Sequence, residues 1–380
     1  MKDNPGRVSA APRSERLFSL DVLRGLDIFL LTAGVAGLLL FAGQEVGLGD
    51  WCSRHIGRHA DWVGFTLWDI IMPLFIFMSG AAIPFALGRR RDQGAKVYWT
   101  HVAGRVALLW FCGMCAQGRL FSYDIMKISP YNNTLQTIAV GYLVAAAVQW
   151  CRRRWLAPLT AILLAVAYAL LLHFGGDYSK EGNFAYLVEI KVLGWIVPAG
   201  SQALNGHGYT WFLTSLMFGA MSLCGMMSTE ILLSSRSPWS KAGSLAAYGA
   251  TLLVIGFGTE LWIPSIKHIF TLSFTAQAMG YSVLSLAVLY VVTDIWRFRK
   301  GLGVFVLFGQ NALFAYMITH FYGRFPNAIA DCFYSGFAHF FTSDTWKWIF
   351  PVFKSVFHIA VMICLVRYWA LLRKARKVTA

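Results

Sequence analysis

The stretch "RHADWVGFTLWDIIMPLFIFMSG", residues 58–80, sets ionisable side chains against a run that is otherwise apolar. Ionisable groups are costly inside a membrane, so those found there commonly mark a function. His59 lies at the edge of the run, and the unperturbed pKa of histidine, about 6.5, suits proton transfer at neutral pH. Trp62 could stack on a sugar or lie at the membrane interface. The stretch predicts acid–base chemistry with His59 as general base; the alternative is a histidine that only caps the following helix.

Asp69 follows His59 by ten residues, which is about 15 Å if the whole interval is helical. We therefore expect no direct bond between the two side chains. Asp69 is instead predicted to lie deeper, to pair with a donor from another span and to organise the wall of the site. His55 and His59 have the i, i+4 spacing of metal ligands, but no third ligand accompanies them, so we predict no metal site.

Charged residues also occur inside or beside other apolar runs. Asp21 and Arg24 are three residues apart and share one face of the first run. They either form a structural ion pair, or Arg24 supplies positive charge to an anionic ligand. Arg105, embedded in a predicted span, either belongs to the basic residues that set topology or binds such a ligand. Lys267 and His268 lie in a short connection between two runs, where they could hold a ligand or anchor the chain at lipid headgroups.

The composition indicates a membrane protein. Hydrophobic residues make up 57% of the 380 residues and charged residues only 13%, which leaves too little polar surface for a soluble globule. The sequence predicts an all-α, polytopic membrane helical bundle of about ten transmembrane helices over 17–373, with a disordered cytoplasmic leader over 1–16 and a basic cytoplasmic tail over 374–380. The expected spans are roughly 19–42, 65–87, 101–120, 135–150, 156–174, 211–229, 244–262, 269–293, 304–322 and 348–371.

The net charge of +15 resides largely in short basic clusters between the apolar runs, such as 89–91 and 152–154. This pattern sets topology and does not resemble a nucleic-acid-binding surface, so we expect no nucleic-acid partner. The positive-inside rule predicts both termini in the cytoplasm and the loop at 43–64 outside, in an inner (cytoplasmic) membrane. Expected partners are membrane lipids and a second copy of the chain, as a homodimer. Cys52 and Cys332, both in predicted outside loops, could pair.

The 58–80 stretch resembles the motif H-x-x-W-x-G-x-x-x-x-D-x-x-x-P-x-F-x-F-x-x-G of the heparan-α-glucosaminide N-acetyltransferase family, in its bacterial branch. The matching residues are His59, Trp62, Gly64, Asp69, Pro73, Phe75, Phe77 and Gly80. Further resemblances follow in order at "TLQTIAVGYL" (134–143), "PSIKHIFTLSF" (264–274) and "GQNALFAYMITHF" (309–321). Thr137 departs from the family, which commonly has arginine there.

The resemblance implies a transmembrane acyltransferase that takes an acetyl group from cytosolic acetyl-CoA and delivers it to an acceptor on the far side, an amino sugar or related glycan. It implies that His59, Asp69 and Asn311 are catalytic, with Asn311 donating to the thioester oxygen. It further implies that acetyl-CoA is bound by Asp21, Arg24, Arg105 and Gln136, and the acceptor by Trp62, Lys267, His268 and His320. Asn311 and His320 are nine residues apart, so one straight helix would not aim both into one narrow groove.

Two other functions fit the same residues. A secondary transporter would also place charged groups inside a bundle, although the halves of this chain show no matched pair of Gly- or Pro-broken spans. An acyltransferase acting on a polymer or lipid hydroxyl would use the same chemistry on another acceptor. The appearance or absence of a covalent acetylated product separates the transporter from both enzymes.

Overall fold

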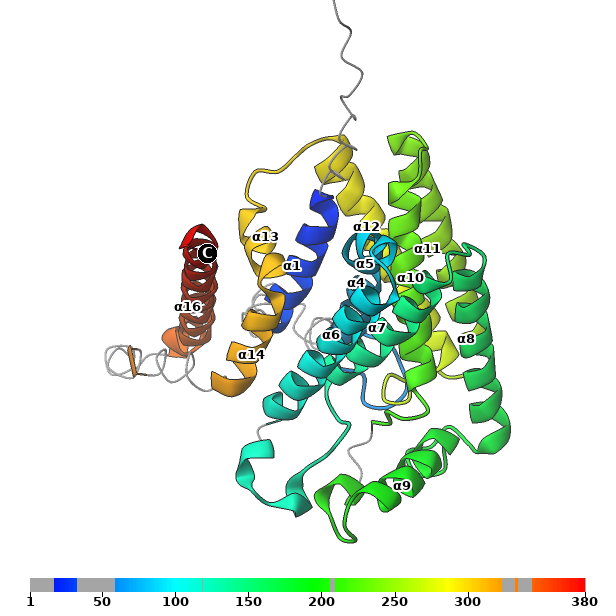
Figure 1. Cartoon of the computed structure of the whole chain (residues 1–380). Helices are drawn as coiled ribbons and strands as arrows, with labels where there is room; N and C mark the ends of the chain where they lie inside the picture. Colours follow the sequence, from blue (N-terminus) through cyan, green and yellow to red (C-terminus); the bar gives the residue numbers. More distant parts are fainter. Residues whose placement is uncertain are drawn as a thin grey trace, which may run out of the picture.

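The computed structural model describes residues 17–32, 59–117, 119–205, 209–322, 332–333 and 344–379. The regular structure in these residues is helical, as predicted (Figure 1). The helices, in chain order, are α1 Phe18–Thr32, η1 Leu67–Ile70, α4 Ile71–Ala81, α5 Ile83–Asp92, α6 Ala95–Ala116, η2 Leu120–Ser122, η3 Ile125–Lys127, α7 Thr134–Trp150, α8 Leu156–Gly175, α9 Phe184–Ile196, η4 Gln202–Asn205, α10 Ser215–Leu233, α11 Pro238–Glu260, α12 Leu272–Tyr290, η5 Val291–Ile295, α13 Gly303–Gln310, α14 Ala312–Tyr322 and α16 Asp344–Thr379.

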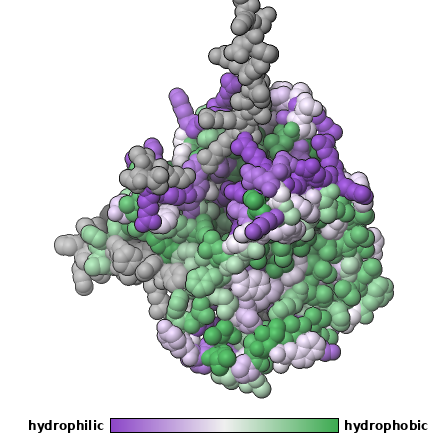
Figure 2. Space-filling model, in the orientation of Figure 1, coloured by the Kyte–Doolittle hydropathy of each residue, from purple (hydrophilic) through white to green (hydrophobic). Residues whose placement is uncertain are grey.

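Six helices among the described residues are long and apolar enough to cross a membrane. They are Leu67–Asp92, Leu156–Gly175, Ser215–Leu233, Pro238–Glu260, Leu272–Ile295 and Val352–Arg376. Apolar side chains on the outer helices are exposed, such as Ile162 on α8 and Val254 on α11, and Figure 2 shows a hydrophobic band below a more hydrophilic end. The chain is therefore a multi-pass membrane protein.

The expected number of about ten spans is not reproduced by these helices. The first expected span corresponds to α1, which has 15 residues before the described range ends at Thr32. The ninth is divided, because Asn311 leaves the helical conformation at φ −123° and ψ 26° and separates α13 from α14. The predicted pairing of Cys52 with Cys332 lies outside the described residues, since Cys52 falls in the undescribed range 33–58. The cytoplasmic position of both termini stays a prediction.

Helices α4 and α10 form the centre of the bundle and touch through their backbones. A Cβ atom on Gly80 would lie 1.8 Å from the carbonyl oxygen of Ser222, and one on Gly225 would lie 1.9 Å from that of Phe77. Only glycine permits such an approach, which is typical of helix contacts in membranes. Because α4 directly continues the short helix that carries Asp69, this contact fixes the base of the candidate site.

One end of the bundle is covered by α9, which runs across the ends of the long helices (Figure 1). Its outward side chains include Leu187 and Trp195, and its inward Glu189 is buried. The Glu189 carboxylate accepts hydrogen bonds from the backbone N–H groups of Trp211 and Phe212, both at 2.9 Å. The helix that covers this end of the bundle is therefore tied to the segment leading into α10.

Candidate functional site

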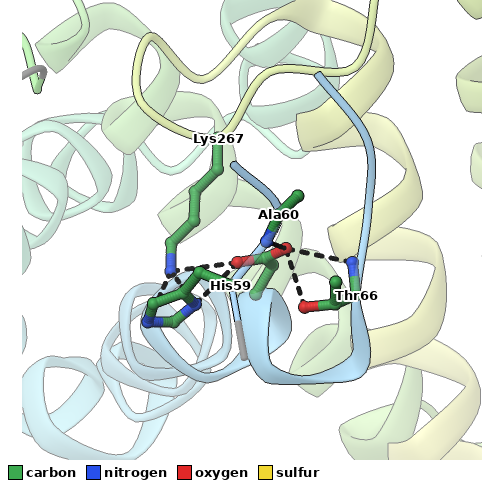
Figure 3. Close-up of polar contacts among 5 residues, drawn as sticks. His59, Ala60, Thr66 and Lys267 are labelled. Atoms are coloured by element: carbon green, nitrogen blue, oxygen red, sulfur yellow. Dashed lines mark hydrogen bonds and ion pairs between the residues drawn. The ribbon is translucent and has the colours of Figure 1, made fainter. Parts of the chain in front are cut away.

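His59, Asp69 and Lys267 meet at the end of the bundle covered by α9, and we call them the His59 cluster (Figure 3). His59 Nδ1 lies 2.7 Å from Asp69 Oδ1, and Lys267 Nζ lies 3.2 Å from the same oxygen. Lys267 Nζ is also 2.8 Å from His59 Nδ1 and 3.3 Å from His59 Nε2. The His59 side chain is 47% exposed, whereas Asp69 is fully buried and Lys267 only 5% exposed. The cluster thus contains one solvent-accessible imidazole, that of His59, which contacts the buried ion pair between Asp69 and Lys267.

The expectation that His59 and Asp69 do not bond directly is wrong. It assumed one continuous helix, but the chain is not helical from His59 to Thr66, and the first helical turn begins at Leu67. Gly64 adopts φ +127°, a conformation that L side chains rarely adopt, and its N–H donates to the carbonyl oxygen of Ser265 at 2.8 Å. The segment therefore folds back and returns His59 to Asp69.

Asp69 is held at both carboxylate oxygens. Oδ2 accepts from the Thr66 N–H at 3.0 Å, the Thr66 hydroxyl at 2.9 Å and the Ala60 N–H at 3.3 Å, while Oδ1 faces His59 and Lys267. The Thr66 bonds belong to a capping box at the start of η1. In the tautomer with the proton on Nδ1, this carboxylate accepts that N–H and leaves Nε2 with a lone pair, which is the arrangement of an oriented general base.

Lys267 comes from the connection between α11 and α12. Thr271 shapes this connection: its hydroxyl accepts from the Ile266 N–H at 3.0 Å and donates to the Pro264 carbonyl oxygen at 2.9 Å. Burial lowers the pKa of Lys267, and the nearby Asp69 carboxylate opposes that shift. Asp69 was predicted to pair with a donor from another span, but its partner Lys267 lies in the connection between two spans. Lys267 points into the protein and does not anchor at lipid headgroups.

Three ring side chains, Trp62, His268 and Tyr209, form an aromatic wall beside the His59 cluster. The Trp62 and His268 rings stack at 5.1 Å between centroids with an angle of 23°, and Tyr209 lies 4.4 Å from His268. Trp62 Nε1 donates to the carbonyl oxygen of Tyr178 at 2.8 Å. Burial lowers the pKa of His268, and the charge of Lys267 adds to the effect. The sequence analysis missed Tyr209, which carries no spacing signal and approaches His268 only in the folded chain.

Arg24 and Arg105 line a cavity of about 250 Å³ between α1, α4, α6, α7 and the α13–α14 break, here called the central cavity. The Arg105 guanidinium lies 4.8 Å from the centre of the Tyr142 ring, and its buried Nε has no hydrogen-bond partner. On α4 the cavity reaches Phe75, six residues beyond Asp69 or about 9 Å of helix. The two arginines predicted to bind an anion are therefore brought together.

Asp21 and Gln136 lie outside the lining of the central cavity. Asp21 is buried on α1, where its carbonyl oxygen faces Gly309. Gln136 closes its own loop, since Nε2 donates to the Pro130 carbonyl oxygen at 2.8 Å and Oε1 accepts from the Asn132 N–H at 2.9 Å. Gln136 therefore stabilises the start of α7, and nothing in its contacts is directed at a ligand in this cavity.

Asn311 and His320 are also engaged locally. Asn311 Nδ2 donates to the carbonyl oxygen of Leu307 at 2.8 Å, and its buried Oδ1 has no partner. His320 Nδ1 donates to the carbonyl oxygen of Tyr316 at 2.9 Å, and the two rings stack at 4.0 Å. Tyr316 itself lines the central cavity and donates to Asn133 Oδ1 at 3.2 Å. The structure does not bring Asn311 or His320 to the His59 cluster.

Comparison with known proteins reveals a distant family relationship. No family model matches the chain. The human heparan-alpha-glucosaminide N-acetyltransferase is 22% identical over 377 residues, an alignment that covers 82% of this chain and 53% of the human protein. The chain thus spans about half the length of the curated relative it matches. The chain is therefore distantly related to an N-acetyltransferase.

Proposed function

We propose that the chain is a transmembrane acetyltransferase that moves an acetyl group from cytosolic acetyl-CoA to an extracytoplasmic acceptor, an amino sugar or related glycan. The observation that carries the proposal is the His59 cluster, in which a buried carboxylate orients an accessible imidazole. The distant relationship to an N-acetyltransferase supports the same reaction type. We further propose the bacterial branch of this family and an inner-membrane location.

Acyl transfer to an amine fits the atoms of the cluster. The acceptor nitrogen attacks the thioester carbonyl carbon, the new C–N bond forms, and the C–S bond breaks. His59 Nε2 takes the proton that the nitrogen loses and returns it to the departing thiolate. Lys267 Nζ, 3.3 Å from Nε2, is a positive donor beside the reacting atoms and would stabilise the developing oxyanion. Lys267 takes over the role expected of Asn311, whose amide N–H is already bonded to Leu307.

The central cavity suits part of an acyl-CoA. Two guanidinium groups favour a phosphate-bearing ligand, and the unpartnered Nε of Arg105 offers a donor to it. A volume of about 250 Å³ is below the roughly 300–1,000 Å³ typical of pockets that enclose a whole drug-sized ligand. We therefore propose that the cavity takes the pantetheine arm and its nearest phosphates, while the nucleotide lies outside the cavity.

The acceptor would bind against the aromatic wall. A sugar ring can lie on an indole or imidazole face, and Trp62 and His268 are held in place by their stacking. His59 is exposed enough for a water-soluble acceptor to reach it. In this proposal Trp62 and His268 position the acceptor, and Lys267, which the resemblance assigned to the acceptor, acts on the thioester.

The test is acetylation across a sealed membrane. Proteoliposomes are loaded with radiolabelled acetyl-CoA and given external glucosamine; the proposal expects labelled N-acetylglucosamine outside. His59→Ala should lower the rate by about 10²–10⁴, whereas His173→Ala, at an exposed histidine of α8, should leave it unchanged. Entry of glucosamine into the proteoliposomes without acetylation would support a transporter and refute the proposal. If only lipid or polymer hydroxyls were acetylated, the protein would still be an acetyltransferase, but its acceptor would not be an amino sugar.

A further inference from the structure

A second, larger hollow lies at the opposite end of the bundle from the His59 cluster, between α5, α7, α8, α10 and α11. It has a volume of about 990 Å³, and we call it the arginine groove after Arg91, Arg154 and Arg236, which line it together with Glu230. A smaller cavity of about 140 Å³ shares Arg91, Arg154 and Glu230 and adds Arg153. Nothing in the proposed acetyl transfer uses these residues.

The charges of the groove are unbalanced. Three arginines line the groove with one glutamate, and among the described residues Arg91, Arg154 and Arg236 form no salt bridge. Arg152 beside them does pair, with Asp92. Excess positive charge in a concave site raises the local concentration of anions. The groove therefore favours an anionic ligand.

Arg91 is the best-placed donor of the groove. Its Nη1 donates to the carbonyl oxygen of Gln149 at 2.8 Å, which fixes the guanidinium between α5 and α7. Its Nε is buried and has no hydrogen-bond partner, although buried polar groups are nearly always paired. An oxygen of a bound ligand would satisfy this donor. Arg236, at the rim, is held by a 2.9 Å hydrogen bond from its Nη1 to Ser244 Oγ.

The surroundings of the groove favour a lipid over a soluble anion as its ligand. Its floor is apolar and contains Pro158, Met227 and Ile231. Trp155 and Trp239, at the starts of α8 and α11, are 55% and 59% exposed, and tryptophan is enriched where helices enter the headgroup layer. In Figure 2 the hydrophilic side chains at this end directly adjoin the hydrophobic band. A ligand in the groove would contact the arginines and, at the same time, the protein surface at the level of the lipid headgroups.

We propose that the arginine groove binds the phosphate headgroup of an anionic phospholipid, with its acyl chains on the apolar floor between α8 and α11. Basic pockets between membrane helices recognise such headgroups through charge-assisted hydrogen bonds. The bound lipid joins α8 and α11, both of which pack on α10. This inference does not depend on the acetyltransferase activity.

The test counts lipids and measures stability. The purified full chain is placed in nanodiscs of phosphatidylcholine with increasing phosphatidylglycerol, and retained lipids are counted by native mass spectrometry after transfer to detergent. Wild type should retain phosphatidylglycerol and gain in Tm. The double variant Arg91→Gln/Arg154→Gln and the rim variant Arg236→Gln should bind it more weakly, the double variant by roughly 30-fold, since each basic group near anionic lipid contributes on the order of 1 kcal/mol.

Lys96→Gln is the matched control, because it removes an exposed positive charge at the same end of the bundle but outside the groove. It should leave retention and Tm unchanged. Equal retention by wild type and Arg236→Gln, with both folded by circular dichroism, would refute the groove as the site. A gain in Tm with inorganic pyrophosphate equal to that with phosphatidylglycerol would assign the groove to a soluble phosphate and overturn the lipid.

Discussion

The His59 cluster and the central cavity use charged groups in opposite ways. In the cluster, both oxygens of Asp69 are engaged by neighbours of the same chain. In the cavity, Arg105 Nε is buried without a partner. A group that must act on a reacting atom is positioned in advance, because reorganisation during the reaction costs rate. A group that binds a charged ligand can remain without a hydrogen-bond partner until the ligand supplies one. This comparison predicts different consequences for substitutions in the two regions.

The largest effect is expected from Asp69→Asn. The amide retains the size of the carboxylate, but its NH₂ group cannot accept the Nδ1–H of His59, so the imidazole is no longer held in the tautomer that frees Nε2. We expect kcat for acetyl transfer to fall about 10³–10⁴-fold. Initial rates at saturating acetyl-CoA measure this. The exposed Asp61→Asn serves as control, and an Asp69→Asn rate within tenfold of wild type would show that His59 does not depend on Asp69.

Lys267→Met should mainly reduce stability. It leaves Asp69, which is fully buried, without its cationic partner, and breaking a buried ion pair costs about 3–5 kcal/mol. We expect a lower midpoint of thermal unfolding in detergent, together with lower kcat because the oxyanion loses its donor. Lys191→Met removes an exposed lysine of α9 and should change neither quantity. If Lys267→Met lowered neither the unfolding midpoint nor kcat, the charge of Lys267 would not be required for stability or for catalysis.

Arg105→Gln tests the other side of the comparison. A charge-assisted hydrogen bond to a ligand contributes about 1.5–3 kcal/mol, so KM for acetyl-CoA should rise about 10–100-fold with little change in kcat. Arg105→Lys should restore part of the affinity. Lys96→Gln, on the same helix and exposed, is the control. A fall in kcat at unchanged KM would place Arg105 in the chemical step and remove the distinction between the two regions.

The smallest effect is expected at Glu189 on α9, the helix that covers one end of the bundle. Burial raises the pKa of Glu189 to about 7 from its usual 4.5, so the folded state binds this proton more tightly than the unfolded state. The resulting stability is fully present below about pH 4.5, falls as the pH rises from there to about 7, and changes little above that. Glu189→Gln should flatten this part of the Tm–pH curve, whereas the exposed Glu181→Gln should not. A curve unchanged by Glu189→Gln would contradict the assignment.

The sequence predicted the class of protein and the grouping of His59 with Asp69, but not the local path of the chain. The 58–80 motif placed His59, Trp62 and Asp69 in one site because their types and spacing are visible without a fold. Their contact depends on a turn with Gly64 at positive φ, which a helical distance estimate ignores. One signal was present: Thr66 and Asp69 have the spacing of a capping box, which indicates that the helix starts only after Thr66.

The roles of Lys267 and Asn311 were harder to predict for a different reason. Lys267 stands in a polar-looking turn, and only the hydrogen bonds of Thr271 make that turn bury it against Asp69. Asn311 stands in an apolar run that indicates one helix, yet its side chain bonds back to Leu307 where the helix breaks. Both outcomes depend on hydrogen bonds of single side chains to nearby backbone groups, which hydropathy and spacing do not encode.

The backbone contact between α4 and α10 limits how this molecule can move. Since Gly80 and Gly225 leave no side chain between the two helices, neither can tilt or slide against the other without a collision of main-chain atoms. A carrier that works by rocking its halves would need such freedom at its centre. We therefore expect α4 and α10 to keep their relative positions while the acetyl group is transferred.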